Sequence, residues 1–285
     1  MRGKEAVRGA FQQARAEGRA ALVLYWPLGY PDLETSIAVV VALAQAGADA
    51  LELGVPFSDP LADGPTIQRA THRALQHGVR TPAVLEAVAR IRGAGVRQAL
   101  CLMTYVNPVL AWGLSAFMEA ARRAGGDGVI LPDVPLEESA PFRAAAEAAG
   151  LAWVPLAAPT TPDPRLRALA ATATGFLYLV SVTGITGVRE RLPEEVVDHL
   201  RRARGAAEGV PVAVGFGISR PEQVAALARE ADGVVIGSAL IQHGEACGFD
   251  REALQAFVAD LRRAAVRTGA PPRCAVPSWE GDPET

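Results

Sequence analysis

The sequence predicts a (β/α)8 barrel with a helix in front of its first strand. Eight short runs rich in β-branched residues and leucine alternate with longer, alanine-rich stretches of helical character. The length of 285 residues suits one barrel, because barrels routinely reach about 250 residues as a single domain. Half of the residues are hydrophobic, which is enough apolar material for one large core. Strand–helix units in this number close most naturally into a barrel.

The predicted strands are spaced so that a helix fits between each pair. They span residues 20–26, 48–54, 98–106, 128–133, 151–157, 175–182, 210–217 and 232–239. The residues up to about 18 are predicted to form a helix that caps the barrel floor. We expect residues 1–267 to form one catalytic domain. The segment 268–285 is rich in proline and glycine and has no periodicity, so it is predicted to be a disordered C-terminal tail.

A doubly wound open sheet is the alternative architecture. Such a sheet normally carries a glycine-rich dinucleotide turn after its first strand, and Leu28-Gly29-Tyr30-Pro31 is not one. Gly215-Phe216-Gly217 begins like that fingerprint, but Arg220 stands where the third glycine belongs, and the strand is the seventh. The sequence therefore favours the barrel.

Charge and hydropathy exclude several classes of protein. The net charge of -3 and the pI near 5.9 predict no nucleic-acid partner. Mean hydropathy is +0.17, and no run approaches the ~18 apolar residues of a membrane span. The charged, helical start lacks the apolar region of a signal peptide, so we expect a cytoplasmic protein without a membrane partner.

Cysteine, lysine and histidine give little support for metal or Schiff-base chemistry. Cys101, Cys247 and Cys274 are odd in number and far apart, which indicates neither a disulfide framework nor a zinc site. Lys4, the only lysine, lies near the N-terminus, where no pocket is expected to activate it for pyridoxal phosphate. The histidines fall in helical stretches or beyond the last strand, so no metal site is predicted; they are His72, His77, His199 and His243.

Glu52, on the second strand, is the candidate catalytic residue. In Leu51-Glu52-Leu53 the alternation of a strand turns the leucines toward the helices and Glu52 toward the barrel mouth. Burial raises the pKa of a carboxyl group, which suits a general acid or base. A core glutamate satisfied by an arginine or by backbone donors is the alternative that this strand leaves open.

The loop after that strand, GVPFSDPLADGPTIQ, contains two aspartates and leads into a helix predicted to open near Thr66. Its prolines stiffen it, and a rigid loop can hold Asp63 over the mouth opposite Glu52. Asp59 and Asp63 could instead be turn formers or helix caps, and for Asp59 that reading is sufficient.

Three later strand ends are rich in glycine, which lets backbone N–H groups approach an anion. They are residues 183–187, 215–219 and 237–238. Such groups at strands seven and eight form the usual phosphate site of a barrel. The stretch GVRERLPEE could close as a lid, in which Arg189 and Arg191 either touch substrate or remain solvated.

Six segments together resemble the α subunit of tryptophan synthase. They are LELGVPFSDPLADGPTIQ, LMTYVNP, VILPDVPLEES, FLYLVSVTGITG, VAVGFGIS and GVVIGSA, and the likeness runs from about residue 10 to 265. The resemblance implies reversible aldol cleavage of indole-3-glycerol phosphate to indole and glyceraldehyde 3-phosphate, in tryptophan biosynthesis. It implies no cofactor for this chain.

The resemblance also implies roles for matching positions. Glu52 matches the acid/base glutamate that protonates the ring carbon bearing the glycerol chain, and Asp63 matches the aspartate that steadies the ring N–H. Protonation of that carbon creates an electron sink, so the C–C bond breaks without lysine or metal. The positions implied at the substrate or its phosphate are Tyr178, Thr186, Gly187, Phe216, Gly217, Gly237 and Ser238. Thr186, on the lid, would meet Asp63. Apart from the resemblance, the candidate walls of the indole pocket are Tyr25, Leu102 or Met103, Tyr105 and Phe216, for which a place in the core is the alternative.

The family pairs this subunit with a pyridoxal-phosphate β subunit in an α2β2 complex that channels indole. The loops implied to face that partner carry Pro56, Pro60, Asn107 and Pro135. The sequence departs from the family pattern at the first strand end, where Trp26-Pro27 replaces the more usual Leu-Thr and Trp26 could reshape the pocket rim. The C-terminal segment extends beyond the family core.

Other functions remain open at this point. One is a stand-alone indole-releasing lyase with the same residues, and a second is another phosphate-binding barrel, such as an isomerase or indole-glycerol phosphate synthase. The synthase is disfavoured because an active-site lysine is missing. A third is a non-catalytic activator of the β subunit, against which the presence of both Glu52 and Asp63 argues, since a regulator has no need of a costly buried acid.

Overall fold

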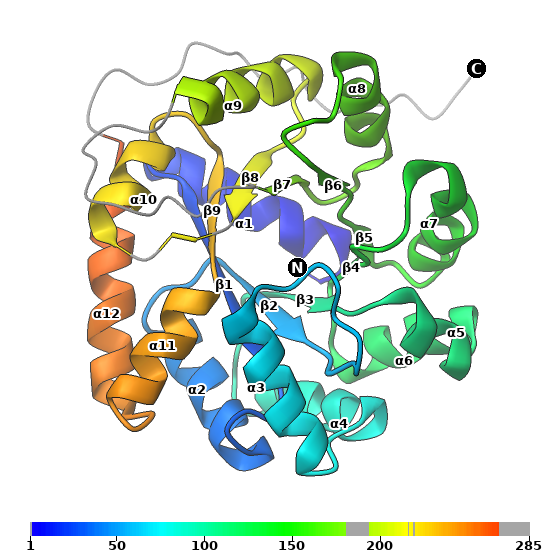
Figure 1. Cartoon of the computed structure of the whole chain (residues 1–285), viewed down its shortest axis with the longest axis vertical. Helices are drawn as coiled ribbons and strands as arrows, with labels where there is room; N and C mark the ends of the chain where they lie inside the picture. The colour runs from blue at the N-terminus through cyan, green and yellow to red at the C-terminus, as the bar shows by residue number, and fades with distance from the viewer. Residues whose placement is uncertain (1, 181–193, 216, 219, 268–285) are drawn as a thin grey trace.

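The computed structural model describes residues 2–180, 194–215, 217–218 and 220–267. Its strands form one parallel sheet in the order β5-β4-β3-β2-β1-β9-β8-β7-β6, and Figure 1 shows helices arranged around these central strands. The strands are β1 (Ala21–Pro27), β2 (Ala50–Gly54), β3 (Ala99–Met103), β4 (Gly128–Ile130), β5 (Ala152–Trp153), β6 (Leu156–Ala157), β7 (Leu177–Val180), β8 (Val212–Gly215) and β9 (Gly233–Ile236). The predicted barrel is confirmed.

The predicted fifth strand is divided into β5 and β6, which stand at the two ends of the sheet order. Only Val154 and Pro155 separate them, and Pro155 has no N–H group to donate to a neighbouring strand. Val154 N–H still donates to the Val129 carbonyl at 3.2 Å, and Tyr178 N–H donates to the Pro155 carbonyl at 3.0 Å. The divided strand therefore bridges β4 and β7 and closes the barrel.

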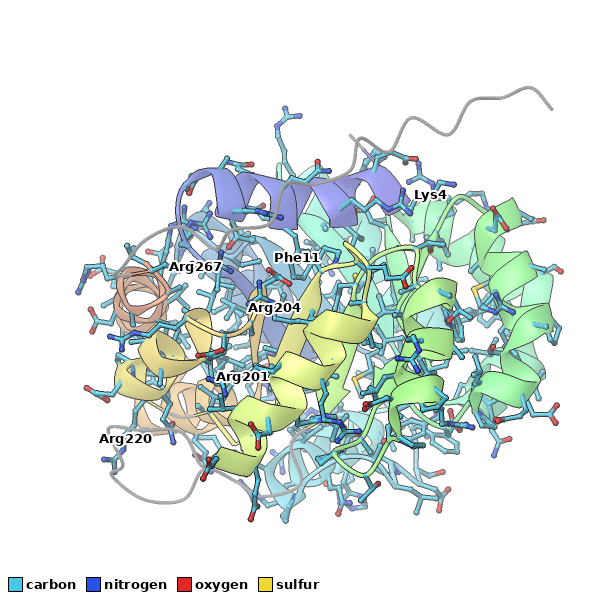
Figure 2. All side chains as sticks on the ribbon, turned by 90° about the horizontal axis from the view of Figure 1, so that it is seen from above. Lys4, Phe11, Arg201, Arg204, Arg220 and Arg267 are labelled. Carbon is cyan, nitrogen blue, oxygen red and sulfur yellow. The ribbon has the colours of Figure 1, made fainter. Side chains whose placement is uncertain are left out.

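The described helices lie outside the strands, except for α1, which lies across one end of the barrel (Figure 2). They are α1 (Lys4–Ala16), α2 (Leu33–Gln45), α3 (Pro65–Gln76), α4 (Thr81–Gly93), α5 (Val106–Trp112), α6 (Leu114–Ala124), the 3-10 helix η1 (Leu136–Glu138), α7 (Ser139–Ala148), α8 (Asp163–Thr172), α9 (Glu194–Ala206), α10 (Pro221–Ala228), α11 (Ser238–Ala246) and α12 (Arg251–Ala264). None of these helices is long and apolar enough to cross a membrane.

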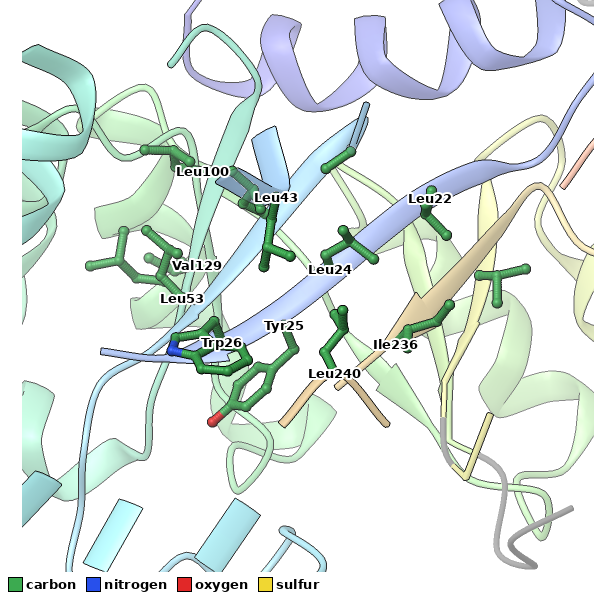
Figure 3. Close-up of a cluster of buried hydrophobic side chains, with 14 of the residues drawn as sticks. Leu22, Leu24, Tyr25, Trp26, Leu43, Leu53, Leu100, Val129, Ile236 and Leu240 are labelled. Atoms are coloured by element: carbon green, nitrogen blue, oxygen red, sulfur yellow. The ribbon is translucent and has the colours of Figure 1, made fainter. Parts of the chain in front are cut away.

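The apolar core has two layers, as the alternation of strand residues requires. The outer layer packs the strands against the helices, and Figure 3 shows Leu22 and Leu24 of β1 with Leu43 of α2 in it. The inner layer fills the barrel and includes Phe11 of α1, whose ring lies 5.0 Å from that of Phe176. The predicted cap of the barrel floor is thus confirmed as α1.

Three aspartates stand directly before strands at the floor end, and we call them the floor aspartates: Asp49, Asp127 and Asp232. Each accepts a backbone N–H from a neighbouring strand; the donors are Leu22 at 2.7 Å, Leu100 at 3.1 Å and Val212 at 3.1 Å, respectively. Each also lies within ion-pair distance of an arginine side chain: Arg19, Arg92 and Arg204, respectively. Paired carboxylates therefore tie adjacent strands together at this end.

Candidate active site

A cavity opens at the carboxyl ends of the strands, the end opposite α1. The residues that line it come from β1, β2, β3, β7 and β9 and from the segments that follow β2, β8 and β9: Tyr25, Glu52, Asp63, Gly64, Ile67, Met103, Tyr178, Gly217, Ile218, Val235, Gly237 and Ser238. Parallel strands bring all their carboxyl ends to one face, which is where barrel enzymes place their active sites. We call this the mouth cavity.

Glu52 points into the barrel, as its strand position predicts. It lies in register with Tyr25 on β1 and Cys101 on β3, and it is only 1% exposed. Among the residues that the structure describes, neither carboxyl oxygen has a hydrogen-bond partner, so the alternative of a core glutamate satisfied by arginine or backbone is not what is found. Burial, with a smaller contribution from the charge of Asp63, raises the pKa of Glu52 to about 8.

Asp63 is held over the same cavity by its loop. Its backbone N–H donates to the Pro60 carbonyl at 3.0 Å, and the Tyr105 hydroxyl donates to Asp63 Oδ2 at 3.1 Å. Burial raises the pKa of Asp63 to about 6, and the hydrogen bond from Tyr105 opposes that rise. The helix α3 takes Gly64 as its N-cap and has no side-chain cap, so Asp63 does not serve as a helix cap. Asp59, in contrast, is exposed and bonded to Ser58.

Hydrogen bonds hold this loop at its start and again just before Asp63. Leu28 N–H donates to the Gly54 carbonyl at 3.0 Å, and Val55 N–H donates to the Met103 carbonyl at 2.9 Å. Farther along, Ala62 N–H donates to the Tyr105 hydroxyl at 3.0 Å. Tyr105 thus receives one hydrogen bond from the loop and gives one to its carboxylate. Tyr105 therefore acts as a hydrogen-bond partner of Asp63, whereas we expected it as a wall of the indole pocket.

Two further tyrosines face the two carboxyl groups. Tyr25 and Tyr178 are 5% and 7% exposed, and burial and the charges of Glu52 and Asp63 raise the pKa of both hydroxyls. Glycines make room for them: a Cβ atom at Gly54 would lie 2.3 Å from Tyr25 Oη, and one at Gly215 would lie 2.4 Å from Tyr178 Oη. Close approach therefore requires glycine at these two strand ends.

The expected phosphate-binding glycines lie at the same cavity. Gly217 follows β8 with a φ of 67°, in the left-handed region that favours glycine. Gly237 is the N-cap of α11 and Ser238 is its first residue, so N–H groups at this helix end lack partners within the helix. Gly217, Gly237 and Ser238 line the cavity together with Glu52. Of the other expected residues, Thr186, Gly187, Arg189, Arg191 and Phe216 lie outside the described residues.

The alternation of side chains along the strands decides which way two residues point that the sequence left undecided. Met103 lines the mouth cavity, while Leu102 is fully buried in the outer layer. Trp26 also faces outward: it is fully buried, its indole N–H donates to the Tyr30 carbonyl at 3.0 Å, and its ring packs against Phe249. The idea that Trp26 reshapes the pocket rim is wrong, because its neighbour Tyr25 occupies the inward position.

The residues implied to face a partner are unequal in exposure. Asn107 and Pro135 are exposed and Pro60 is half-buried, but Pro56 is buried. Pro56 therefore offers no surface for a partner, because the bonds at the start of the loop draw it onto the barrel. Leu61, next to Pro60, is 89% exposed and was missed by sequence reasoning, since a leucine in a loop belongs to no periodic pattern. Ile67, which lines the cavity one turn into α3, was missed for the opposite reason: its position on the helix is typical of core.

The side chains that could hold a metal are dispersed. Among the described residues, no three histidine, cysteine, aspartate or glutamate side chains are grouped closely enough to bind a metal ion. His72 lies on α3, His199 on α9 and His243 on α11, and His77 follows α3. Lys4 begins α1 at the floor, at the other end of the barrel from Glu52.

Comparison with known proteins identifies one family. A family model described as tryptophan synthase alpha chain matches residues 11–266. The tryptophan synthase alpha chain of Chloroflexus aggregans is 48% identical over 235 residues, which cover 82% of this chain and 88% of that relative. The alpha chain of Geobacillus kaustophilus is 52% identical over 217 residues, covering 76% of this chain and 80% of the relative.

Solved structures show the same likeness. A chain of tryptophan synthase from Mycobacterium tuberculosis is 40% identical, with a TM-score of 0.84 over 92% of this chain and 98% of that one. The tryptophan synthase alpha chain of Legionella pneumophila subsp. pneumophila is 33% identical, with a TM-score of 0.83 over 93% of this chain and 97% of that one. The likeness to each solved chain therefore extends over more than nine tenths of this chain.

Proposed function

The chain belongs to the tryptophan synthase alpha chain family and is a lyase that cleaves indole-3-glycerol phosphate, and from this premise we propose that Glu52 and Asp63 carry its proton transfers. One observation supports this proposal above the others. Glu52 is buried without a hydrogen-bond partner among the described residues, in the cavity that Asp63 also lines. An unsatisfied buried acid lowers stability, so its presence in the cavity favours a catalytic use.

Glu52 acts as the acid and then as the base. With a pKa of about 8, it is mostly protonated at pH 7 and can give its proton to the indole carbon that bears the glycerol chain. The electron pair of the C–C bond then returns to the ring, and the glycerol hydroxyl becomes the aldehyde of glyceraldehyde 3-phosphate. The hydroxyl proton passes to the Glu52 carboxylate, so the residue ends the cycle as it began.

Asp63 stabilises the positive charge that protonation creates at the indole nitrogen. With a pKa of about 6, it is mostly ionised at pH 7, and Tyr105 fixes its orientation through Oδ2. A carboxylate that is placed before the charge develops needs no reorganisation during the reaction. The two acids thus differ in protonation state at one pH, although they share a cavity.

Glycine backbone and a helix end are proposed to hold the phosphate. Gly217, Gly237 and Ser238 present backbone N–H groups at the mouth, and the α11 N-terminus adds its dipole. Thr186, Gly187 and Phe216, which lie outside the described residues, are proposed to complete the substrate site. Tyr178, Tyr25 and Met103 would form the wall around the indole.

The proposed partner is a tryptophan synthase β subunit in an α2β2 complex. The exposed or half-buried positions Pro60, Leu61, Asn107 and Pro135 lie on loops and on α5 near the mouth, where indole leaves. We propose that this chain needs neither metal nor cofactor of its own, and that pyridoxal phosphate belongs to the β subunit alone. A cytoplasmic location is proposed together with this role.

The test is indole release from indole-3-glycerol phosphate by the purified chain and by its Glu52→Gln variant. Glutamine keeps the shape but cannot give and take the proton, so turnover should fall at least about 1,000-fold. Calorimetry should show that the variant still binds the substrate. Asp59→Asn is the matched control, since Asp59 lies in the same region but outside the cavity, and it should retain the activity of the parent chain.

Adding β subunit to the same assay tests the partner. Weak activity that rises strongly with β supports the α2β2 proposal, whereas high activity indifferent to β would favour a stand-alone lyase. Substantial turnover by Glu52→Gln would contradict the assigned role of Glu52, whatever the effect of β.

A further inference from the structure

A second cavity lies at the barrel floor, on the opposite face from the mouth cavity. It has a volume of about 610 Å³, within the range of about 300–1,000 Å³ that is typical of small-molecule sites. It is lined by residues of α1, of α9, of the segments before β7 and β8, and of the residues around α12 and β9: Arg8, Phe11, Gln12, Arg15, Ala16, Ala173, Gly175, Arg204, Gly209, Val210, Pro211, Asp232 and Arg267. Figure 2 labels Phe11, Arg204 and Arg267 beneath α1. We call this the floor cavity.

Positive charge dominates this cavity. Four arginines line it, with Asp232 as the single acidic residue among the described residues of the lining. Asp232 Oδ1 lies 3.8 Å from Arg204 and 3.7 Å from Arg267, so one oxygen is shared by two guanidinium groups beyond hydrogen-bond distance. Its Oδ2 accepts the Val212 N–H instead. Asp232 therefore supplies one negative charge to the two guanidinium groups of Arg204 and Arg267.

Arg267 is partly buried beside other charged groups. Burial lowers the pKa of Arg267, Asp232 opposes that decrease, and the nearby charges of Arg204 and Arg15 add smaller decreases. Like charges gathered in a partly buried cavity repel each other unless an anion joins them. A ligand that carries negative charge would relieve that repulsion.

The guanidinium groups are also held in place. Arg267 donates through Nε to the Ala228 carbonyl and through Nη2 to the Ala231 carbonyl, both at 2.9 Å. Arg204 donates through Nη1 to the Glu230 carbonyl at 3.2 Å. A guanidinium carries several N–H donors in a rigid fork, so donors remain on both residues for a ligand, and the fork matches a carboxylate. Arg8 and Arg15 have partners of their own, and only their charge enters the argument.

Most of the remaining wall is apolar. Phe11, Ala173, Val210 and Pro211 line it, and Gln12 adds one polar side chain. We propose that the floor cavity binds a small organic carboxylate, with its acid groups between Arg204 and Arg267 and its apolar body against Val210 and Pro211. This inference does not rest on the proposed roles of Glu52 and Asp63, because the two cavities share no residue.

The test is calorimetric titration of the purified full chain with benzene-1,2-dicarboxylate. We expect one binding site per chain, and we expect Arg204→Gln to weaken binding at least about tenfold, because a charge-assisted hydrogen bond is lost. Arg201→Gln is the matched control: Arg201 lies one turn away on α9, is 64% exposed in its side chain and does not line the cavity. Its affinity should equal that of the parent chain. Arg267→Gln gives a second variant, and thermal unfolding checks that each variant is folded.

A kinetic measurement distinguishes binding at the floor cavity from binding at the mouth cavity. The dicarboxylate should leave the KM for indole-3-glycerol phosphate unchanged, whereas competitive inhibition would place it in the mouth cavity and overturn the proposal. Absence of binding by the parent chain at millimolar concentration, or equal affinity in folded Arg204→Gln and Arg201→Gln, would overturn it as well.

Discussion

The two ends of this barrel bury carboxyl groups in opposite ways. At the floor, Asp127 is fully buried and accepts hydrogen bonds from Gly3 N–H at 2.7 Å, from Leu100 N–H at 3.1 Å and from the Arg92 guanidinium. At the mouth, Glu52 is equally buried but has no hydrogen-bond partner in the part of the chain that is described. Burial alone therefore says little about what a carboxyl group does; its partners decide.

The physical reason is the cost of removing a charge from water. Hydrogen bonds and a guanidinium stabilise the ionised form of a buried carboxylate, so a paired aspartate joins strands together. Without partners the same group holds its proton to a higher pH, and it can then exchange that proton near neutrality. Barrels commonly divide their ends in this way, with stability at the floor and chemistry at the mouth.

Breaking the pairing at the floor should have the largest effect on stability. Asp127→Asn removes the charge that faces Arg92, whose side chain is only 7% exposed, and leaves that guanidinium buried without its counter-ion. The free energy of unfolding should fall by about 3–5 kcal/mol, as urea denaturation would show. Turnover per folded molecule should not change. If the stability of the variant were unaltered, the pairing of the floor aspartates would not stabilise the barrel.

Removing the charge of Asp63 at the mouth cavity should lower turnover and leave stability nearly unchanged. Asp63→Asn keeps an acceptor for Tyr105 but removes the negative charge from the cavity, so kcat for indole release should fall about 100- to 1,000-fold. The melting temperature should hardly move, because Asp63 forms no ion pair with the residues that the structure describes and burial already disfavours its charged form. A large loss of stability with normal kcat would show that Asp63 resembles the floor aspartates after all.

The pH dependence of stability sharpens the comparison. The pKa of Glu52 is about 8 in the folded chain and near 4.5 ordinarily, so the folded state holds a proton that the unfolded state releases between these values. Its contribution to stability therefore falls as pH rises through that window. Glu52→Gln removes this term, and its stability relative to the parent chain should increase by about 3 kcal/mol between pH 5 and pH 8. Denaturation at both pH values measures the difference; a constant difference would argue against a raised pKa.

The smallest expected effect concerns Tyr105, whose hydroxyl donates a hydrogen bond to the Asp63 carboxylate. Tyr105→Phe removes the hydrogen bond that lowers the pKa of Asp63, so this pKa should rise above its value of about 6. Because Asp63 must be ionised, activity is lost as pH falls through its pKa, and the acid limb of the pH–rate profile should move to higher pH. At pH 7 the loss in kcat should be about tenfold or less. An acid limb that stays in place would assign that limb to another group.

Local pattern was enough to predict the barrel, the regions in which the described strands lie and the direction of Glu52, although the predicted fifth strand is divided into β5 and β6. Side chains alternate along a strand whatever surrounds it, so Leu51, Glu52 and Leu53 could be assigned to their faces directly from the sequence. The same rule, applied to Tyr25 and Trp26, would have placed Trp26 outside the pocket. The division of the fifth strand at Pro155 is also local, since proline lacks the N–H group.

The contacts of the site were decided by the tertiary structure. Asp63 meets Tyr105 across 42 residues of sequence, and Asp127 meets Gly3 across 124. No periodic pattern relates such positions. The sequence therefore could not show that Glu52 has no hydrogen-bond partner among the described residues, nor foresee that Pro56 is buried and Leu61 exposed. The sequence by itself determined the fold and the residue types at the strand ends, because these follow from short-range alternation. Only the closed barrel decided which carboxyl groups have partners, because a partner is set by proximity in space.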